Sequence, residues 1–151
     1  MGRILNSDNL QSTLHRLKTE GRKIVFTNGC FDLIHIGHIR CLRAAKQFGD
    51  VLVVGLNSDK SVSLLKPGRP ITPQDQRAEV LSSLEMVDYV TLFNEATPYE
   101  LITLIQPDVL VKGGDWKKED IIGSDIAKET LSIPYIEGIS TTDIIERIRK
   151  L

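Results

Sequence analysis

The chain has 151 residues, of which 41% are hydrophobic and 26% are charged, and its formal net charge at pH 7 is −1. This length suits a single domain, residues 1–151, that buries a real core, while scattered Lys and Arg residues without a basic stripe give no reason to expect a nucleic-acid partner. The two cysteines, Cys30 and Cys41, lack the paired spacing of a zinc site or a disulfide framework, and we expect no metal site built from the protein.

Membrane attachment and export are also not expected. The sequence contains no apolar run long enough to cross a bilayer and no leader in which a charged segment precedes an apolar one. We therefore expect a cytoplasmic protein without a membrane partner.

The first third of the chain predicts a helix, a strand and a second helix. The first helix is expected over Ser7–Thr19, capped by Ser7, and we treat residues 1–21 as an N-terminal helical extension. A strand follows over residues 23–28. The apolar residues of the second helix recur at steps of three: Ile39, Leu42, Ala45 and Phe48.

Strands and helices continue to alternate toward the C-terminus. Strands are expected over Val51–Asn57, 88–93, 108–111 and 133–136, and helices over 73–85 with Thr72 as the cap, after Thr97, and from Ser140 onward. Such alternation predicts an α/β fold, a Rossmann-like parallel sheet of about five strands with helices on both faces. Ligands bind open sheets of this kind beyond the carboxyl ends of the strands, and each motif described below follows a predicted strand.

The segment 29–38, with the sequence GCFDLIHIGH, is the most informative part of the chain. His35 and His38 lie where a strand leads into a helix, close to backbone N–H groups without an intrahelical partner and to the positive end of the helix dipole. Gly37 lets an oxyanion approach the backbone closely. This arrangement favours a site for a nucleoside triphosphate over two ordinary surface histidines.

Three other segments contribute candidate ligands. Lys66 lies in a loop with Gly68 and two prolines, where it is either a solvated lysine or a point charge for a phosphate. Arg77 is either a simple surface charge or has a phosphate-binding or structural role. Residues 112–116 combine a cation, two glycines, a carboxylate and an aromatic ring, which favours binding over an ordinary turn. Ser140 begins a capping pattern whose free N–H groups could hold a second anion.

The segment 29–38 resembles the HxGH signature of the nucleotidylyltransferase superfamily in its cytidylyltransferase-like form, GxFDxxHxGH, and the resemblance covers nearly the whole chain from about Arg22 onward. Further segments are similar to the group of these enzymes that adenylylates D-glycero-β-D-manno-heptose 1-phosphate. They are residues 26–32, 57–59, 69–71, 76–77, 87–90 and 111–115. The resemblance implies AMP transfer from ATP to the sugar 1-phosphate, which yields ADP-heptose for lipopolysaccharide and pyrophosphate.

The resemblance also implies roles for residues, a cofactor and an assembly. The implied catalytic residues are His35, His38 and Lys66. The implied nucleotide-binding residues are Asn28, Gly29, Cys30, Phe31, Asp32, Gly37, Lys112, Gly113, Ser140 and Thr141. The implied sugar-phosphate-binding residues are Asn57, Asp59, Arg77, Gly114, Asp115 and Trp116. Mg²⁺ would accompany ATP, and the protein would be a homodimer.

One departure from the family pattern bears on the choice of nucleotide. Cytidylyltransferases for glycerol 3-phosphate and phosphocholine place Arg-Thr before Glu-Gly-Ile-Ser-Thr, whereas this chain has Tyr135 and Ile136 there. The missing arginine favours ATP over CTP. Two alternatives stay open: a cytidylyltransferase acting on glycerol 3-phosphate or a similar phosphorylated alcohol, and a nucleotide-binding module without turnover.

Overall fold

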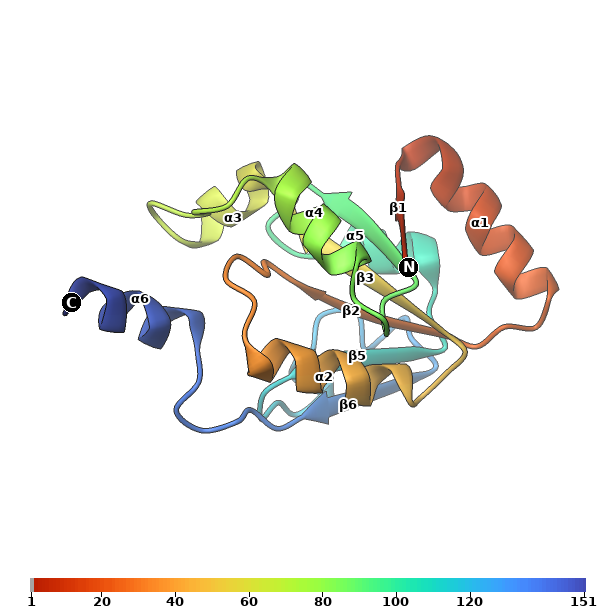
Figure 1. Ribbon diagram of the computed structural model, residues 1–151. Coiled ribbons are helices and arrows are strands. Elements are labelled where there is room, and N and C mark those ends of the chain that lie inside the picture. Colours follow the sequence, from red (N-terminus) through yellow and green to blue (C-terminus); the bar gives the residue numbers. More distant parts are fainter. Residues whose placement is uncertain (1) are drawn as a thin grey trace.

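A computed structural model describes residues 2–151, so Met1 lies outside the description. Within these residues, one open sheet has the strand order β1-β4-β3-β2-β5-β6, and all neighbouring strands run parallel (Figure 1). The strands are β1 (Arg3–Leu5), β2 (Ile24–Gly29), β3 (Val51–Asn57), β4 (Tyr89–Phe93), β5 (Val109–Gly113) and β6 (Glu129–Ile133). The expected parallel α/β sheet is confirmed, with one strand more than predicted.

Helices cover both faces of the sheet, as expected, while the last helix projects away from it (Figure 1). They are α1 (Ser7–Thr19), α2 (Ile36–Lys46), α3 (Asp59–Leu65), α4 (Gln74–Ser82), α5 (Tyr99–Ile105), the 3₁₀ helix η1 (Lys118–Asp120) and α6 (Thr141–Arg149). Side chains of α1 and α5 pack on one face of the sheet, and side chains of α2 and α4 pack on the other. No helix among residues 2–151 is both long enough and apolar enough to cross a membrane.

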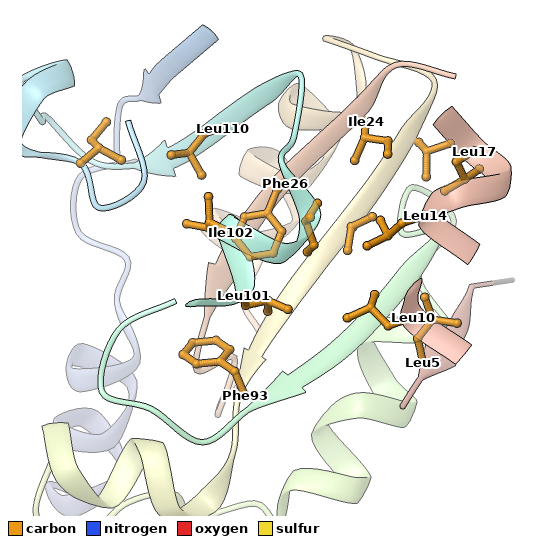
Figure 2. Close-up of a cluster of buried hydrophobic side chains, with 14 residues drawn as sticks. Leu5, Leu10, Leu14, Leu17, Ile24, Phe26, Phe93, Leu101, Ile102 and Leu110 are labelled. Atoms are coloured by element: carbon orange, nitrogen blue, oxygen red, sulfur yellow. The ribbon is translucent and has the colours of Figure 1, made fainter. Parts of the chain in front are cut away.

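The core on the α1 and α5 face is built around Phe26 of β2 (Figure 2). Ile102 of α5 lies beside the Phe26 ring, and Leu14 of α1 packs toward the same strands. Each such apolar side chain contributes about 1.5–3 kcal/mol when it is fully buried. The helices are therefore held against the sheet, and the carboxyl ends of the strands have fixed positions.

The N-terminal segment is part of the core. The predicted bounds of α1 are confirmed, but the prediction of Ser7 as its cap is wrong, because Asn6 Oδ1 accepts hydrogen bonds from the N–H groups of Asp8 and Asn9, both at 3.0 Å. The strand β1 was not predicted, and it pairs with β4. Among residues 2–21, the strand and the buried leucines of α1 thus join the sheet and its core and are more than a helical extension.

Three other local predictions differ from the structure. The last strand is Glu129–Ile133 and not 133–136, since Pro134 has no N–H to donate to the ladder. Thr72 does not cap α4, which begins after Pro73 without a side-chain cap, and α3 was not predicted. Phe48 follows the end of α2 and is 40% exposed.

The strand order determines where a ligand can bind. From β2 the chain proceeds to β3 and then β4 on one side, and afterwards crosses to β5 and β6 on the other side. The reversal lies between β2 and β5, and ligands bind such sheets beyond the carboxyl ends of the strands at this point. Asn28 and Lys112 lie near the ends of these two strands.

Candidate active site

His35 and His38 form a stacked pair at the start of α2. His35 is the cap residue of the helix, and its Nδ1 accepts a hydrogen bond from the N–H of Gly37 at 3.1 Å. The N–H of His35 in turn donates to Nδ1 of His38 at 3.2 Å. The two ring centroids are 3.9 Å apart. The helix start therefore determines the orientation of both imidazoles.

These backbone contacts also determine which ring nitrogen carries the proton. In a neutral imidazole, the nitrogen that accepts a hydrogen bond is unprotonated and the other nitrogen is a donor. Both Nδ1 atoms accept, so both Nε2 atoms carry the proton. Burial lowers the pKa of His35, and burial together with the nearby His35 and Lys66 lowers the pKa of His38 to about 4. Both side chains are thus neutral donors at pH 7.

Phe31 and Gly37 shape the surroundings of the pair. Phe31 has φ 47°, an unusual value for a residue with a side chain, and its ring centroid lies 5.2 Å from that of His38. A Cβ on Gly37 would lie 2.9 Å from His35 Cε1, so only glycine leaves the imidazole its place. Strained backbone that holds a ring in place is common at functional sites.

Two lysines supply positive charge near the histidines. Lys66 follows α3, is exposed, and lies close enough to lower the pKa of His38. Lys112 is half-buried, burial lowers its pKa, and its Nζ lies 5.6 Å from the centroid of the Trp116 ring. In the described part of the chain, neither lysine has a carboxylate partner. Both are therefore available to an anionic ligand.

The start of α6 lies beside the histidine segment. Thr141 Oγ1 donates to the backbone oxygen of Leu33 at 3.4 Å, and a Cβ on Gly37 would lie 3.9 Å from Ile139 Cγ2. Ser140 caps the helix, as predicted, by accepting from the N–H of Asp143 at 3.0 Å. Thr141 uses its hydroxyl proton within the protein, whereas Ser140 only accepts, so α6 offers a phosphate the Ser140 O–H group and the first backbone N–H groups of the helix.

Asp32 holds the loop that follows Lys66. Its carboxylate accepts from Arg69 Nε at 2.9 Å and from the N–H groups of Ile71 and Thr72, both at 2.9 Å. Burial alone would raise the pKa of Asp32, but the hydrogen bonds of Thr72, Ile71 and Arg69 outweigh it and hold the pKa below its usual value. The Asp32 carboxylate thus positions this loop, and its contact with the nucleotide stays a prediction.

Arg77 is a buried clamp with an exposed fraction of 1%. Its guanidinium donates to the backbone oxygens of Cys30 at 2.7 Å and Asn57 at 2.8 Å, and to Asp59 Oδ1 at 2.8 Å. Of the roles left open for Arg77, this geometry matches the structural one, and the burial of the side chain excludes a simple surface charge. It also assigns Asn57 and Asp59, two predicted sugar-phosphate ligands, to the network that joins the ends of β2 and β3 to α4.

The segment after β5 forms a platform beside the two strand ends. Trp116 Nε1 donates to the backbone oxygen of Gly113 at 3.1 Å, and the Trp116 ring is 45% exposed. A small cavity of about 70 Å³ lies between this ring, Asn28 and Lys112. Gly114 is buried, and Asp115 is exposed and forms no ion pair within residues 2–151.

The predicted site residues thus fall into two groups. One group lies around the histidine pair and the end of β5, and the other, Asn57, Asp59 and Arg77, forms hydrogen bonds within the protein. The predicted residues near the histidine pair are Gly29, Cys30, Phe31, Gly37, Lys66, Ser140 and Thr141, while Lys112 and Gly113 lie at the end of β5 beside Cys30 and Cys41. Sequence reasoning missed Arg69, which pairs with Asp32, and it missed Pro98, Asp120 and Ile121, which line the cavity. The charge of Arg69 inside a loop that contains Gly and Pro could have indicated a functional residue. The residues that line the cavity come from segments without any motif.

A comparison with protein families and curated proteins identifies relatives. A family model described as Cytidylyltransferase-like matches residues 26–147. The chain is 59% identical over 134 residues to the bifunctional protein HldE of Nitratiruptor sp., which is 88% of this chain and 29% of that protein. It is 54% identical over 148 residues to the bifunctional protein HldE of Wolinella succinogenes, which is 97% of this chain and 31% of that protein. The chain spans less than a third of these relatives.

Two solved structures share the fold. The lipopolysaccharide core biosynthesis protein from Thermoplasma volcanium GSS1 has a TM-score of 0.66 and 28% identity, over 78% of this chain and 100% of that one. The pantoate-beta-alanine ligase from Francisella tularensis, complexed with beta-gamma ATP and beta-alanine, has a TM-score of 0.58 and 15% identity, over 100% of this chain and 79% of that one. The second likeness concerns the fold alone.

Proposed function

The chain belongs to the cytidylyltransferase-like family, and from this premise we propose that it is an adenylyltransferase that transfers AMP from ATP to a sugar 1-phosphate. The observation that carries the proposal is the histidine pair. Two neutral imidazoles that carry their protons on Nε2 are donors for phosphate oxygens, and the backbone of α2 holds them in place through their Nδ1 atoms before any substrate arrives. Preorganised donors of this kind stabilise charge that develops in a transition state.

The reaction follows from the placement of these donors and cations. An oxygen of the acceptor phosphate attacks the α-phosphorus of ATP, a new P–O bond forms, and the bond from the α-phosphorus to the bridging oxygen breaks with departure of pyrophosphate. His35 and His38 donate to the oxygens on which negative charge increases, while Lys66 and Lys112 neutralise the phosphate chain. The protein positions the reactants and stabilises charge, without a covalent intermediate.

Mg²⁺ enters this proposal as a part of the substrate. Within residues 2–151, no three His, Cys, Asp or Glu side chains lie close enough together to hold a metal ion by themselves. Asp32 and Asp59 are already paired with Arg69 and Arg77. Mg²⁺ commonly takes most of its ligands from substrate phosphates and water, so this donor set fits an ion that arrives bound to ATP.

The acceptor that we propose is D-glycero-β-D-manno-heptose 1-phosphate. This choice rests on the resemblance of the sequence to heptose 1-phosphate adenylyltransferases, and the relationship to HldE proteins and to a lipopolysaccharide core biosynthesis protein supports it. The Trp116 ring beside Asn28 and Asp120 offers an aromatic plate and polar groups suited to a sugar. A cytoplasmic location and a homodimer belong to the same proposal.

The test is a matrix of nucleotides and acceptors with pyrophosphate release as the readout. ATP and CTP are each combined with heptose 1-phosphate and with glycerol 3-phosphate. We expect release with ATP and heptose 1-phosphate at a rate well above the other three combinations. Faster release with CTP and glycerol 3-phosphate would instead identify a cytidylyltransferase, and nucleotide binding without any release would identify a binding module.

The substitution His38→Ala tests the role of the histidine pair. Removal of one preorganised donor typically lowers turnover by about 10²- to 10³-fold, and we expect a loss in this range. His15, which is exposed on α1, provides a matched control, and His15→Ala should retain full activity. A loss below about fivefold for His38→Ala in a folded protein would contradict the assignment.

A further inference from the structure

We propose that Tyr135 is the platform on which the purine base of the nucleotide stacks. The inference rests on the proposed function and deepens it, because it assigns a residue that selects the base. Tyr135 and Ile136 occupy the positions where related cytidylyltransferases have Arg-Thr.

The Tyr135 ring rests on the backbone at the end of β5. A Cβ on Gly114 would lie 2.7 Å from Tyr135 Cε2 and 3.0 Å from Cζ, and a Cβ on Gly113 would lie 3.6 Å from Cε1. Gly114 also has φ +109°, which residues with a side chain rarely adopt. The two glycines therefore create the flat seat on which this ring lies.

The rest of the Tyr135 ring is open to solvent. The side chain is 72% exposed, whereas Phe31 beside the histidines is 7% exposed. An aromatic ring that has one support and an otherwise free surface buries little apolar area, so it contributes little to the stability of the fold. The free surface is suited to stack on a second ring.

The position of the Tyr135 ring relative to the phosphate-binding groups indicates that the second ring is the base of the nucleotide. Lys112 directly precedes the two glycines, and residues 134–140, which include Tyr135, connect the end of β6 to the start of α6 (Figure 1). Ile139 in this connection lies next to Gly37 of the histidine segment. A nucleotide whose phosphates contact His35 and Lys112 thus has Tyr135 on the wall along which its nucleoside extends.

The stacking surface predicts a preference among bases. Stacking of a base on an aromatic side chain is sensitive to the size of the overlapping π-systems, and a purine presents two fused rings where a pyrimidine presents one. Tyr135 contributes through its ring and not through its hydroxyl, so phenylalanine can replace it. An arginine at the same position would instead bring positive charge toward the phosphates.

Binding to the full chain, measured by calorimetry, tests the platform without requiring turnover. The probes are ATP, CTP and tripolyphosphate, which has the phosphates but no base. For Tyr135→Ala we expect ATP to bind about 5- to 150-fold more weakly, the range that corresponds to the loss of one stacked base. CTP should lose less, tripolyphosphate should bind as to the unchanged protein, and Tyr135→Phe should bind ATP as the unchanged protein does.

Tyr135→Leu separates stacking from apolar packing, because leucine retains bulk without a π-system, and it also serves if the alanine variant does not fold. We expect Tyr135→Leu to lose ATP affinity with tripolyphosphate affinity retained. Unchanged ATP binding by both variants would overturn the proposal, and so would an equal loss for ATP and tripolyphosphate. If ATP binding depends on Tyr135 but no pyrophosphate is released with any acceptor, the proposed function fails while the platform stands.

Discussion

At the scale of single residues, two backbone N–H groups determine what the histidines can do. The N–H groups of Gly37 and His35 occupy both Nδ1 atoms and leave the protons on Nε2. Histidine in this arrangement acts as an oriented neutral donor, in contrast to its more frequent role as a proton shuttle near pH 7. The backbone at the start of α2 and the two side chains together therefore produce a pair of oriented hydrogen-bond donors.

The pH dependence of stability provides a test of this neutral state. The pKa of His38 falls from 6.5 to about 4 on folding, so between these values the unfolded chain binds more protons than the folded one. The free energy of unfolding should therefore be level above pH 6.5 and should decrease as the pH falls from 6.5 toward 4.

Urea denaturation at several pH values measures this decrease, and NMR titration of the imidazole signals measures the pKa directly. In the His38→Asn variant, the decrease between pH 6.5 and 4 should be smaller than in the unchanged protein. A His38 signal that titrates at or above 6.5 would show that the imidazole is not held neutral.

Arg77 is the second residue whose surroundings determine its role. Its side chain is buried and joins Cys30, Asn57 and Asp59. Asp59 is half-exposed, so the main cost of Arg77→Ala is that the backbone oxygens of Cys30 and Asn57 lose their donor. Each polar group left unsatisfied costs about 1–3 kcal/mol, and we expect the free energy of unfolding to fall by about 2–6 kcal/mol. Arg43, exposed at the end of α2, is the control, and Arg43→Ala should change stability by less than about 0.5 kcal/mol.

Chemical denaturation of both variants measures these differences. Arg77→Lys should recover little of the loss, because an ammonium group cannot reproduce the planar fork that reaches several acceptors at once. An Arg77→Ala variant of unchanged stability with a raised KM for the acceptor would return Arg77 to the phosphate-binding role.

At the scale of elements, helix starts combine structure and binding. The cap at α2 orients the histidines, and the cap at α6 presents N–H groups beside them. The loop between α3 and α4 depends on Asp32, which holds Arg69, Ile71 and Thr72 from the other side of the site. Lys66 is exposed and lies at the start of this loop, and Asp32 fixes the other end of the loop.

The cap of α1 has no part in the site and permits a clean test of local structure. Asn6 accepts two hydrogen bonds at the start of α1, while Ser7 is the first helical residue. Loss of an N-cap side chain costs about 1 kcal/mol, so Asn6→Ala should lower the free energy of unfolding by about that amount with activity unchanged. Ser7→Ala should have a much smaller effect, and the reverse order in urea denaturation would contradict the assignment.

At the scale of the whole molecule, the parallel sheet brings distant segments to one place. The histidines follow β2, Lys112 lies near the end of β5 and Ser140 caps α6, and these segments meet at the edge of the sheet where β2 and β5 end. The position of the site is a consequence of strand order, because parallel strands have their carboxyl ends at the same edge.

The homodimer is a prediction at the same scale. Light scattering coupled to size exclusion should give twice the chain mass of 16.9 kDa at micromolar concentrations. Addition of ATP should not change this mass if the assembly precedes binding. A mass of 16.9 kDa over the whole concentration range would show a monomer.

The sequence alone was sufficient to predict those elements and caps that depend on a few neighbouring residues. The bounds of α1, the buried strand β3 and the cap of α6 by Ser140 were predicted because periodicity, apolar runs and capping residues act over a few neighbouring positions. The three-residue strand β1 was missed because it depends on β4, more than eighty residues away in the sequence.

The sequence by itself determined the parallel α/β fold, the histidine segment and the family, since these are written in patterns and motifs of adjacent residues. Only the tertiary structure decided which polar groups are available to a ligand. Asp32, Asn57 and Arg77 have side chains suited to binding, yet burial requires each to satisfy its hydrogen bonds within the protein. Tyr135 is the opposite case, a side chain that is available to a ligand. Its ring rests on Gly113 and Gly114, and no local sequence pattern contains this contact between two segments.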